Sequence, residues 1–184
     1  IEGFMDFAAL PPVLQEELEA GVLPLRVTHN DTKLNNVLMD EKTGRALCVI
    51  DLDTVMPGLA AYDFGDAIRF GASTALEDET DLDKVHFSLP YYRAFAEGYL
   101  EAFGSRLNEA ELLSLPMGAK LMTLEVGIRF LGDYLNGDVY FKVDYPEHNL
   151  VRARTQLRLL QEMEAHWQEM NDVVRELGKG RSKA

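Results

Sequence analysis

The chain has 184 residues, of which 47% are hydrophobic and 27% are charged, as is ordinary for a soluble globular protein with one core. Its formal net charge of −13 argues against electrostatic binding to nucleic acid or to an anionic membrane. No apolar run is long enough to span a bilayer and the N-terminus lacks a signal-peptide pattern, so we expect a cytoplasmic protein.

The residues before Thr28 predict a helix followed by a short strand. Residues 11–21 begin with two prolines and end with Gly21, which is typical of a helix because proline is tolerated in the first turn and glycine is favoured after the last. We give this helix a scaffolding role. The short run Leu25-Arg26-Val27, with two apolar residues, then predicts a strand.

The stretch from Thr28 to Asp53 holds the densest group of polar side chains. Two apolar runs, separated by the polar residues 40–44, predict a β-hairpin that ends at Asp51 and Asp53. The second run contains Cys48, and since this is the only cysteine the chain has no intramolecular disulfide. A hairpin returns the chain to its start, so Asp51 can approach the residues that precede the hairpin. These residues are His29, Asp31, Lys33, Asn35 and Asn36.

The remainder of the chain is predicted to be helical with loops between the helices. The acidic residues between 77 and 83 are expected to form a solvated surface, and Pro116 is expected to kink or split its helix. We expect helices over 62–70, 87–103, 108–136 and 147–177, loops over 71–83 and 138–146, and a flexible tail over 178–184. One hairpin and a set of helices indicate a mostly helical α+β fold.

Three sequence blocks between Thr28 and Thr74 resemble a known group of enzymes. H-N-D-T-K-L-N-N at residues 29–36 is similar to the H-x-D-x-x-x-x-N loop of the aminoglycoside phosphotransferase and choline kinase group, relatives of the protein kinases. The blocks I-D-L-D-T-V-M-P-G and Y-D-F-G-D-A-I-R-F-G-A-S-T bring the closer likeness to the N-acetylhexosamine 1-kinases. The resemblance implies that residues 1–177 form the C-terminal lobe of a protein-kinase-like fold. Because no glycine-rich loop precedes Thr28, the N-terminal nucleotide-binding lobe is expected to be absent from this chain.

The resemblance also implies the roles of the residues that would handle phosphate. Asp31 corresponds to the catalytic base, and Asn36 and Asp51 correspond to ligands of Mg²⁺, with Asp51 bridging the metal to the phosphates of ATP. Carboxylate and amide oxygens suit such a hard cation. Lys33 corresponds to a lysine that neutralises the γ-phosphate, although a surface lysine is the alternative. Asp53 is expected to bind a second metal ion, to approach the γ-phosphate, or to cap the turn.

Two further residues are expected to hold the catalytic loop, and five are candidates to bind the acceptor. His29 is expected to pin the loop through its imidazole, and Asp63 is expected to accept hydrogen bonds from backbone N–H groups of the loop. By resemblance the acceptor side includes Phe70, Arg129 and Tyr140, and Arg69 and Asp133 are the other two candidates. The competing interpretations are core packing for the aromatic residues and a pair within one helix between Arg129 and Asp133.

The sequence therefore predicts an ATP- and Mg²⁺-dependent kinase that phosphorylates the anomeric hydroxyl of an N-acetylhexosamine. The chain alone is expected to be inactive without a nucleotide-binding lobe. Choline, an aminoglycoside and homoserine remain as alternative acceptors. A haloacid dehalogenase-like phosphatase, with Asp51 as nucleophile and Asp53 as acid, leaves residues 29–36 unexplained and expects alternating strands after residue 64. A non-catalytic binding module is the third class, and the presence of Asp31, Asn36 and Asp51 argues against it.

Overall fold

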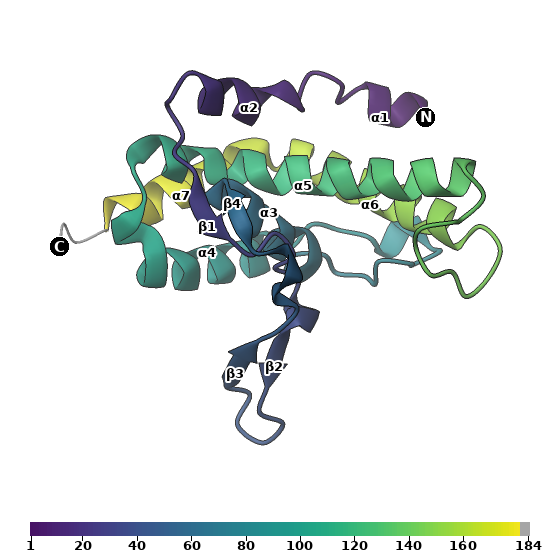
Figure 1. Ribbon diagram of the computed structural model, residues 1–184, viewed down its shortest axis with the longest axis horizontal. Helices are drawn as coiled ribbons and strands as arrows, with labels where there is room; N and C mark the ends of the chain where they lie inside the picture. The colour runs from purple at the N-terminus through teal and green to yellow at the C-terminus, as the bar shows by residue number, and fades with distance from the viewer. Residues whose placement is uncertain (181–184) are drawn as a thin grey trace.

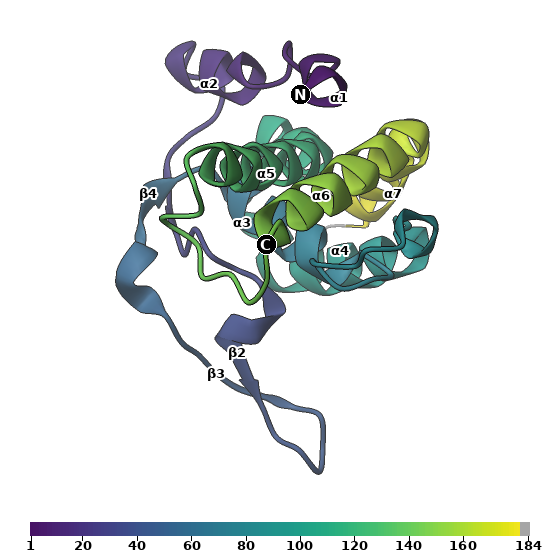
Figure 2. The ribbon, with the colours of Figure 1, turned by 90° about the vertical axis from the view of Figure 1, so that its right-hand side faces the viewer.

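The computed structural model describes residues 1–180 as a mostly helical α+β fold, which confirms the fold class. Five longer helices form the body, the short N-terminal helices lie along one side of it, and a hairpin projects from the opposite side (Figures 1 and 2). The helices are α1 (Glu2–Met5), α2 (Pro12–Glu19), α3 (Ala60–Gly71), α4 (Leu89–Phe103), α5 (Glu109–Leu135), α6 (His148–Ala165) and α7 (Trp167–Lys179). The strands are β1 (Arg26–Thr28), β2 (Val37–Met39), β3 (Ala46–Val49) and β4 (Met56–Gly58). Within residues 1–180, no helix is both long enough and apolar enough to cross a membrane.

The strands form two separate antiparallel pairs. β2 pairs with β3, with Val37 opposite Val49, so the predicted hairpin is confirmed. β1 pairs with β4, with Val27 opposite Pro57. Pro57 and Gly58 are typical of a turn, but residues 56–58 form a strand. A two-stranded ribbon tolerates Pro57 because both of its strands are edges, where a missing N–H is not needed by a further neighbour.

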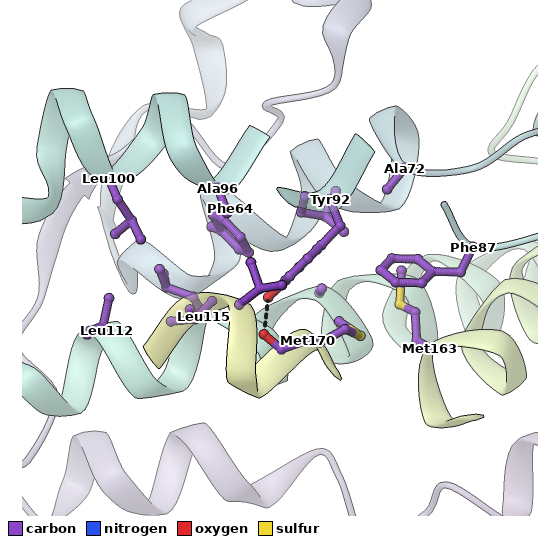
Figure 3. Close-up of a cluster of buried hydrophobic side chains, with 14 of the residues drawn as sticks. Phe64, Ala72, Phe87, Tyr92, Ala96, Leu100, Leu112, Leu115, Met163 and Met170 are labelled. Carbon is purple, nitrogen blue, oxygen red and sulfur yellow. Dashed lines mark hydrogen bonds between the residues drawn. The ribbon is translucent and has the colours of Figure 1, made fainter. Parts of the chain in front are cut away.

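The main core lies between α3, α4, α5 and the C-terminal helices, and Phe64 of α3 is at its centre. Phe64 is fully buried, and its ring centroid lies 5.9 Å from that of Tyr92 and 5.2 Å from that of Tyr99. The hydroxyl of Tyr92 donates a hydrogen bond of 3.3 Å to the carbonyl of Met170, which satisfies a buried polar group and ties α4 to α7 (Figure 3). The apolar residues that the helical spacing predicted for α3 therefore face the core.

The backbones of α3 and α5 touch where the two helices pack together. A Cβ atom at Gly65 would collide with the backbone of Gly118, and a Cβ atom at Gly118 would collide with the carbonyl of Ala61. Neither obstacle is a flexible side chain, so neither can move aside cheaply. Glycine at both positions is therefore what allows α3 to lie directly against α5.

Helix α5 runs without interruption past Pro116, so the expected split is wrong. Its start is fixed by a capping box, in which Asn108 accepts a hydrogen bond from the N–H of Glu111 and the Glu111 carboxylate accepts one from the N–H of Asn108. Pro116 removes one backbone hydrogen bond, but it is buried in a helix that packs against both α3 and α6. Tertiary packing thus outweighs the local cost of the proline.

The predicted helix over 147–177 is in fact two helices that meet at His166. The Nδ1 atom of His166 lies 2.9 Å from the carbonyl of Glu162, which is also the acceptor for the His166 backbone N–H. The side chain thus competes for a backbone acceptor at the place where the helix ends. The flexible tail was expected to begin at residue 178, which is too early, since α7 extends to Lys179. Residues 181–184 of the expected tail lie outside the described residues.

A pair of glycine substitutions in α5 tests the contact between α3 and α5. We expect Gly118→Ala to lower the free energy of unfolding by about 1–3 kcal/mol, because the new methyl group overlaps the backbone of Ala61. Gly132→Ala in the same helix meets no atom within 4 Å and is expected to raise it by up to about 1 kcal/mol through helix propensity. Urea denaturation of both variants measures the difference. Equal effects of the two substitutions would contradict the close contact.

Candidate active site

Asp63, in the first turn of α3, holds the start of the loop formed by residues 29–36. Its two carboxylate oxygens accept hydrogen bonds from the backbone N–H groups of His29, at 2.8 Å, and of Asn30, at 2.7 Å. These are the contacts that the resemblance implies for Asp63. Burial raises the pKa of Asp63 above its ordinary value, and the two N–H donors oppose this rise without cancelling it. The two hydrogen bonds therefore hold the carboxylate in place, although its burial disfavours the charged form.

The loop is also fastened to the chain that follows the hairpin. Nε2 of His29 lies 2.9 Å from the carbonyl of Ile50, and since a carbonyl only accepts, Nε2 carries the proton. The hydroxyl of Thr54 donates to the carbonyl of His29 at 2.6 Å, and the amide of Asn30 donates to the carbonyl of Thr54 at 3.0 Å. His29 thus ties the two ends of the hairpin together, as its expected pinning role requires.

Asp31 has one occupied and one free carboxylate oxygen. Its Oδ2 accepts hydrogen bonds from Nζ of Lys33, at 3.0 Å, and from Nδ2 of Asn36, at 2.9 Å. The same Nδ2 donates to the backbone carbonyl of Asp31 at 2.8 Å. Oδ1 of Asp31 accepts no hydrogen bond within residues 1–180 and is therefore free to accept one from another molecule.

The hairpin brings the backbone of Ile50, the residue before Asp51, into contact with the backbone of Asn36. The N–H of Ile50 donates to the carbonyl of Asn36 at 2.9 Å. Asp51 follows in the left-handed region at φ = 61° with an exposed side chain, and Asp53 is exposed in the short turn Leu52–Thr54. No hydrogen bond or ion pair within the described part of the chain joins Asp51 to Asp31 or Asn36 directly.

The oxygen donors of Asn36 and Asp51 are of the type that fits Mg²⁺, and they are too few to hold a metal ion by protein ligands alone. Among the described residues, no group of three or more His, Cys, Asp or Glu side chains is placed to hold a metal ion. A carboxylate and an amide oxygen suit Mg²⁺, which is commonly held by one or two carboxylates and completed by substrate phosphates and water. The amide of Asn36 points its nitrogen at Asp31, which leaves the amide oxygen for the opposite side.

A cavity of about 510 Å³ opens beside Asp31 and collects the residues expected to bind the acceptor. Asn36, Asp51 and Asp53 are not in its lining. Its lining includes the loop of residues 29–36, the last turn of α3, one face of α5 and the loop between α5 and α6, which lies on the same side of the helices as the hairpin (Figures 1 and 2). The predicted site residues in this lining are Asp31, Lys33, Arg69, Phe70, Arg129 and Tyr140.

Arg129 interacts with aromatic residues and not with Asp133. Its guanidinium lies 5.5 Å from the ring centroid of Tyr140 and 5.3 Å from that of Phe141, and it donates to the hydroxyl of Tyr140 at 3.4 Å. Its partner within the helix is Glu125, at 3.4 Å, so the pair expected with Asp133 is wrong. Arg129 is exposed, and its position against aromatic rings keeps its charge at the cavity wall.

Asp133 instead organises the loop that carries Tyr140, a role that sequence reasoning missed. Its carboxylate accepts hydrogen bonds from the N–H groups of Val139, Tyr140 and Phe141, and from the side chain of Asn149. Burial raises the pKa of Asp133, but these donors outweigh burial and hold the pKa below its ordinary value. The only local signal was an acidic residue shortly before the turn residues Asn136 and Gly137.

Arg69 is a buried guanidinium with two acidic partners. Its Nε lies 3.0 Å from Asp66, and its Nη1 lies 2.6 Å from Glu77. The acidic residues 77–83 were expected to be a solvated surface, and for Glu77 this is wrong, because a buried cation needs a compensating charge. Arg69 therefore shapes the cavity wall while its charge is largely neutralised.

The lowered pKa of Asp133 predicts a pH-dependent contribution to stability. Because its pKa is lower in the folded state, the contribution is complete above the unfolded pKa of about 3.9 and is lost as the pH falls through the folded value. We expect Asp133→Asn to lower the free energy of unfolding at pH 7, and its difference from the wild type to shrink towards pH 3. Urea denaturation over this range measures it, with the exposed Asp172→Asn as control. A difference that is constant with pH would contradict the assignment.

One comparison with known proteins concerns this region of the chain. The model of the phosphotransferase enzyme family, called APH, matches residues 4–106. The match covers more than half of the chain and includes the loop of Asp31, the hairpin and the whole of α3. The chain therefore belongs to the phosphotransferase enzyme family.

Proposed function

We propose that this chain is the acceptor-binding and metal-binding lobe of an ATP-dependent kinase that phosphorylates the anomeric hydroxyl of an N-acetylhexosamine. The observation that carries the proposal is the free Oδ1 of Asp31 at the wall of a cavity of about 510 Å³. Such a volume is within the usual range of small-molecule sites. The family supports a phosphotransferase acting on a small molecule.

In the proposed reaction, the hydroxyl oxygen of the acceptor attacks the γ-phosphorus of ATP. A new bond forms between this oxygen and phosphorus, the bond from phosphorus to the bridging oxygen breaks, and ADP leaves. The proton of the hydroxyl passes to Oδ1 of Asp31. An aspartate is a weak base, but in a loose transition state the proton leaves late, so the orientation given by Lys33 and Asn36 matters more than basicity.

The metal would be held by Asn36 and Asp51 and would supply positive charge to the phosphates of ATP. Asn36 is buried and bonded to Asp31, so it would hold the metal side of the site in a fixed relation to the base. Lys33 adds a cation next to Asp31, where the transferred phosphoryl group arrives. In the proposed role it exchanges its contact with Oδ2 for one with the γ-phosphate.

The charges around the cavity explain how a chain of net charge −13 can handle a phosphate. The carboxylates that line the cavity are Asp31, Asp66, Glu77 and Glu125, and the cations are Lys33, Arg69, Arg129, Lys142 and Arg152. Five cations against four carboxylates give a local charge of +1. A positive region within an otherwise acidic surface attracts an anionic co-substrate.

The same lining favours a neutral hydroxylated acceptor over a cationic one. Phe70 and Tyr140 offer ring faces to the apolar side of a sugar, and Arg129 offers hydrogen-bond donors. Choline or an aminoglycoside would bring positive charge into a cavity that already has a cation in excess. We therefore place the N-acetylhexosamine first and keep the other acceptors as alternatives. A phosphatase with Asp51 as nucleophile has less support, because that fold expects alternating strands after residue 64 and residues 65–180 contain no named strand.

The hairpin and its surroundings supply a surface for the nucleotide-binding lobe that a kinase of this kind needs. Large apolar side chains of β1, β2 and β3 are exposed here, with Val27 84%, Leu47 65% and Val49 53% exposed. A group of exposed apolar residues is typical of an interaction surface. We propose that the nucleotide-binding lobe, with its phosphate-covering loop, packs against these strands and closes over Asp31.

Removal of the proposed base tests the catalytic assignment. We expect Asp31→Ala in the full-length protein to lower kcat by on the order of 10³-fold or more, because the acceptor loses both its proton acceptor and its orientation. Asp172→Ala, an exposed change on α7, serves as a control and should leave kcat unaltered. ADP release with N-acetylglucosamine and ATP–Mg²⁺ measures both. If Asp31→Ala retains most of the activity, the assigned base is wrong.

A panel of acceptors tests the substrate separately. We expect ADP release and sugar 1-phosphate formation with N-acetylglucosamine or N-acetylgalactosamine, because the lining is suited to a neutral hydroxylated ring. Choline, an aminoglycoside and homoserine form the comparison set. Turnover with one of these and not with either sugar would keep the kinase assignment and overturn the acceptor.

A further inference from the structure

A second cavity of about 550 Å³ adjoins the first, on the side of α6. It is lined by the segment after α3, residues 73–78, and by Asp144 and three residues of α6. Five residues line both cavities, namely Asn35, Arg69, Phe70, Glu77 and Arg152. The two cavities are therefore neighbouring chambers that share a wall, with the ring of Phe70 in the lining of both.

Three residues that line the second cavity each have a buried polar side-chain atom without a hydrogen-bond partner within residues 1–180. These atoms are Nε2 of His148, Oε1 of Gln156 and Nε of Arg152. His148 and Gln156 are each only 2% exposed. The three residues follow one another at intervals of four along α6, so they lie on one face of the helix. Because buried polar groups are almost always bonded, three such residues around one cavity point to a polar ligand.

The hydrogen bond at Nδ1 of His148 fixes which ring nitrogen has the hydrogen, and this makes Nε2 a hydrogen-bond donor. Nδ1 of His148 accepts a hydrogen bond of 3.1 Å from the N–H of Asp144, so the proton of the neutral ring is on Nε2. The ring is held by Tyr145, which stacks on it with centroids 4.3 Å apart. Asp78 has an oxygen 3.3 Å from Nε2, but without the alignment of a hydrogen bond. His148 is thus a fixed, neutral donor.

Arg152 and Gln156 complete the set with a donor and an acceptor. Nη1 of Arg152 donates to the carbonyl of Lys142, at 3.1 Å, and to Oδ1 of Asn149, at 3.2 Å. Its guanidinium also lies 5.4 Å from the ring centroid of Phe130. These contacts hold the side chain and leave its Nε–H as a fixed donor. Oε1 of Gln156 is a neutral acceptor in the same wall.

The charges of the second cavity exclude an anion as the preferred ligand. The carboxylates of its lining are Glu77, Asp78 and Asp144, and its cations are Arg69 and Arg152. Three carboxylates against two guanidinium groups give a net charge of −1, with His148 neutral. Neutral donors and acceptors beside an aromatic ring match the hydroxyl groups and the apolar face of a sugar ring.

We propose that the second cavity binds a second hydroxylated ring of the acceptor, so that the preferred acceptor is a disaccharide and not a single hexosamine. The inference rests on the proposed function, because the first ring must lie beside Asp31 in the first cavity. The second ring then extends past Phe70 and bonds with His148, Arg152 and Gln156. Each chamber has the volume of a small-molecule site, so two rings have room.

The test compares two sugars and one pair of variants in the full-length protein. The sugars are N-acetylglucosamine and N,N′-diacetylchitobiose, and the quantity is the ratio of kcat/KM for the disaccharide to that for the monosaccharide. We expect the ratio to be about ten, and Gln156→Met to lower it about tenfold, because one buried hydrogen bond to the second ring is lost. Gln168→Met, on the exposed face of α7, is the matched control and should leave the ratio as it is.

The outcomes separate the second ring from the proposed function. Transfer to both sugars at equal kcat/KM, unaffected by Gln156→Met, overturns the second-ring proposal and leaves the kinase in place. If neither sugar is phosphorylated, the proposed function fails, and calorimetric titration with N,N′-diacetylchitobiose then decides on the cavity. Binding of the disaccharide that Gln156→Met weakens supports the cavity, and the absence of binding overturns it. Thermal unfolding of each variant verifies that it is folded.

Discussion

The direct backbone contact between α3 and α5 is the constraint on which the rest of the structure depends. Gly65 and Gly118 allow the two helices to touch where any side chain would keep them apart. This contact fixes α3, and α3 carries functional groups at both ends. Asp63 in its first turn holds the loop of Asp31, and Phe70 in its last turn lines both cavities. A shift of one helix against the other would thus move the proposed base and the acceptor wall at the same time.

Two carboxylates build the walls of the first cavity without lining it. Asp63 collects the backbone N–H groups of residues 29 and 30, and Asp133 collects those of residues 139–141. The arrangement is the same on both sides of the cavity: a carboxylate on a helix accepts hydrogen bonds from the backbone N–H groups of a loop. The pKa of the two groups moves in opposite directions. For Asp63 burial outweighs two donors and raises the pKa, whereas for Asp133 the donors outweigh burial and lower it.

Local patterns predicted the elements of this fold, and long-range packing decided what they could not predict. The hairpin and the helices α2, α3, α4 and α5 follow from periodicity, capping and turn residues that lie close together in the sequence. The pairing of β1 with β4 joins residues some thirty positions apart and left no local trace. The ion pair of Arg69 with Glu77 and the three unpartnered atoms of α6 likewise depend on neighbours that only the fold supplies. The residues of the loop of Asp31 could be named from the sequence because they are eight consecutive residues, whereas their chemical roles stay predictions.

The backbone at the two ends of the hairpin has a consequence for how this protein can evolve. Asn30 and Asp51 both adopt left-handed conformations, at φ = 62° and φ = 61°, which glycine would occupy at a lower conformational cost. Asn30 uses its amide to hold Thr54, and Asp51 is the proposed ligand of the metal. Replacement by glycine would therefore relieve the backbone at either position, but it would also remove the side chain that holds Thr54 or the one proposed to bind the metal. Selection for heat resistance and selection for turnover would oppose each other at these positions.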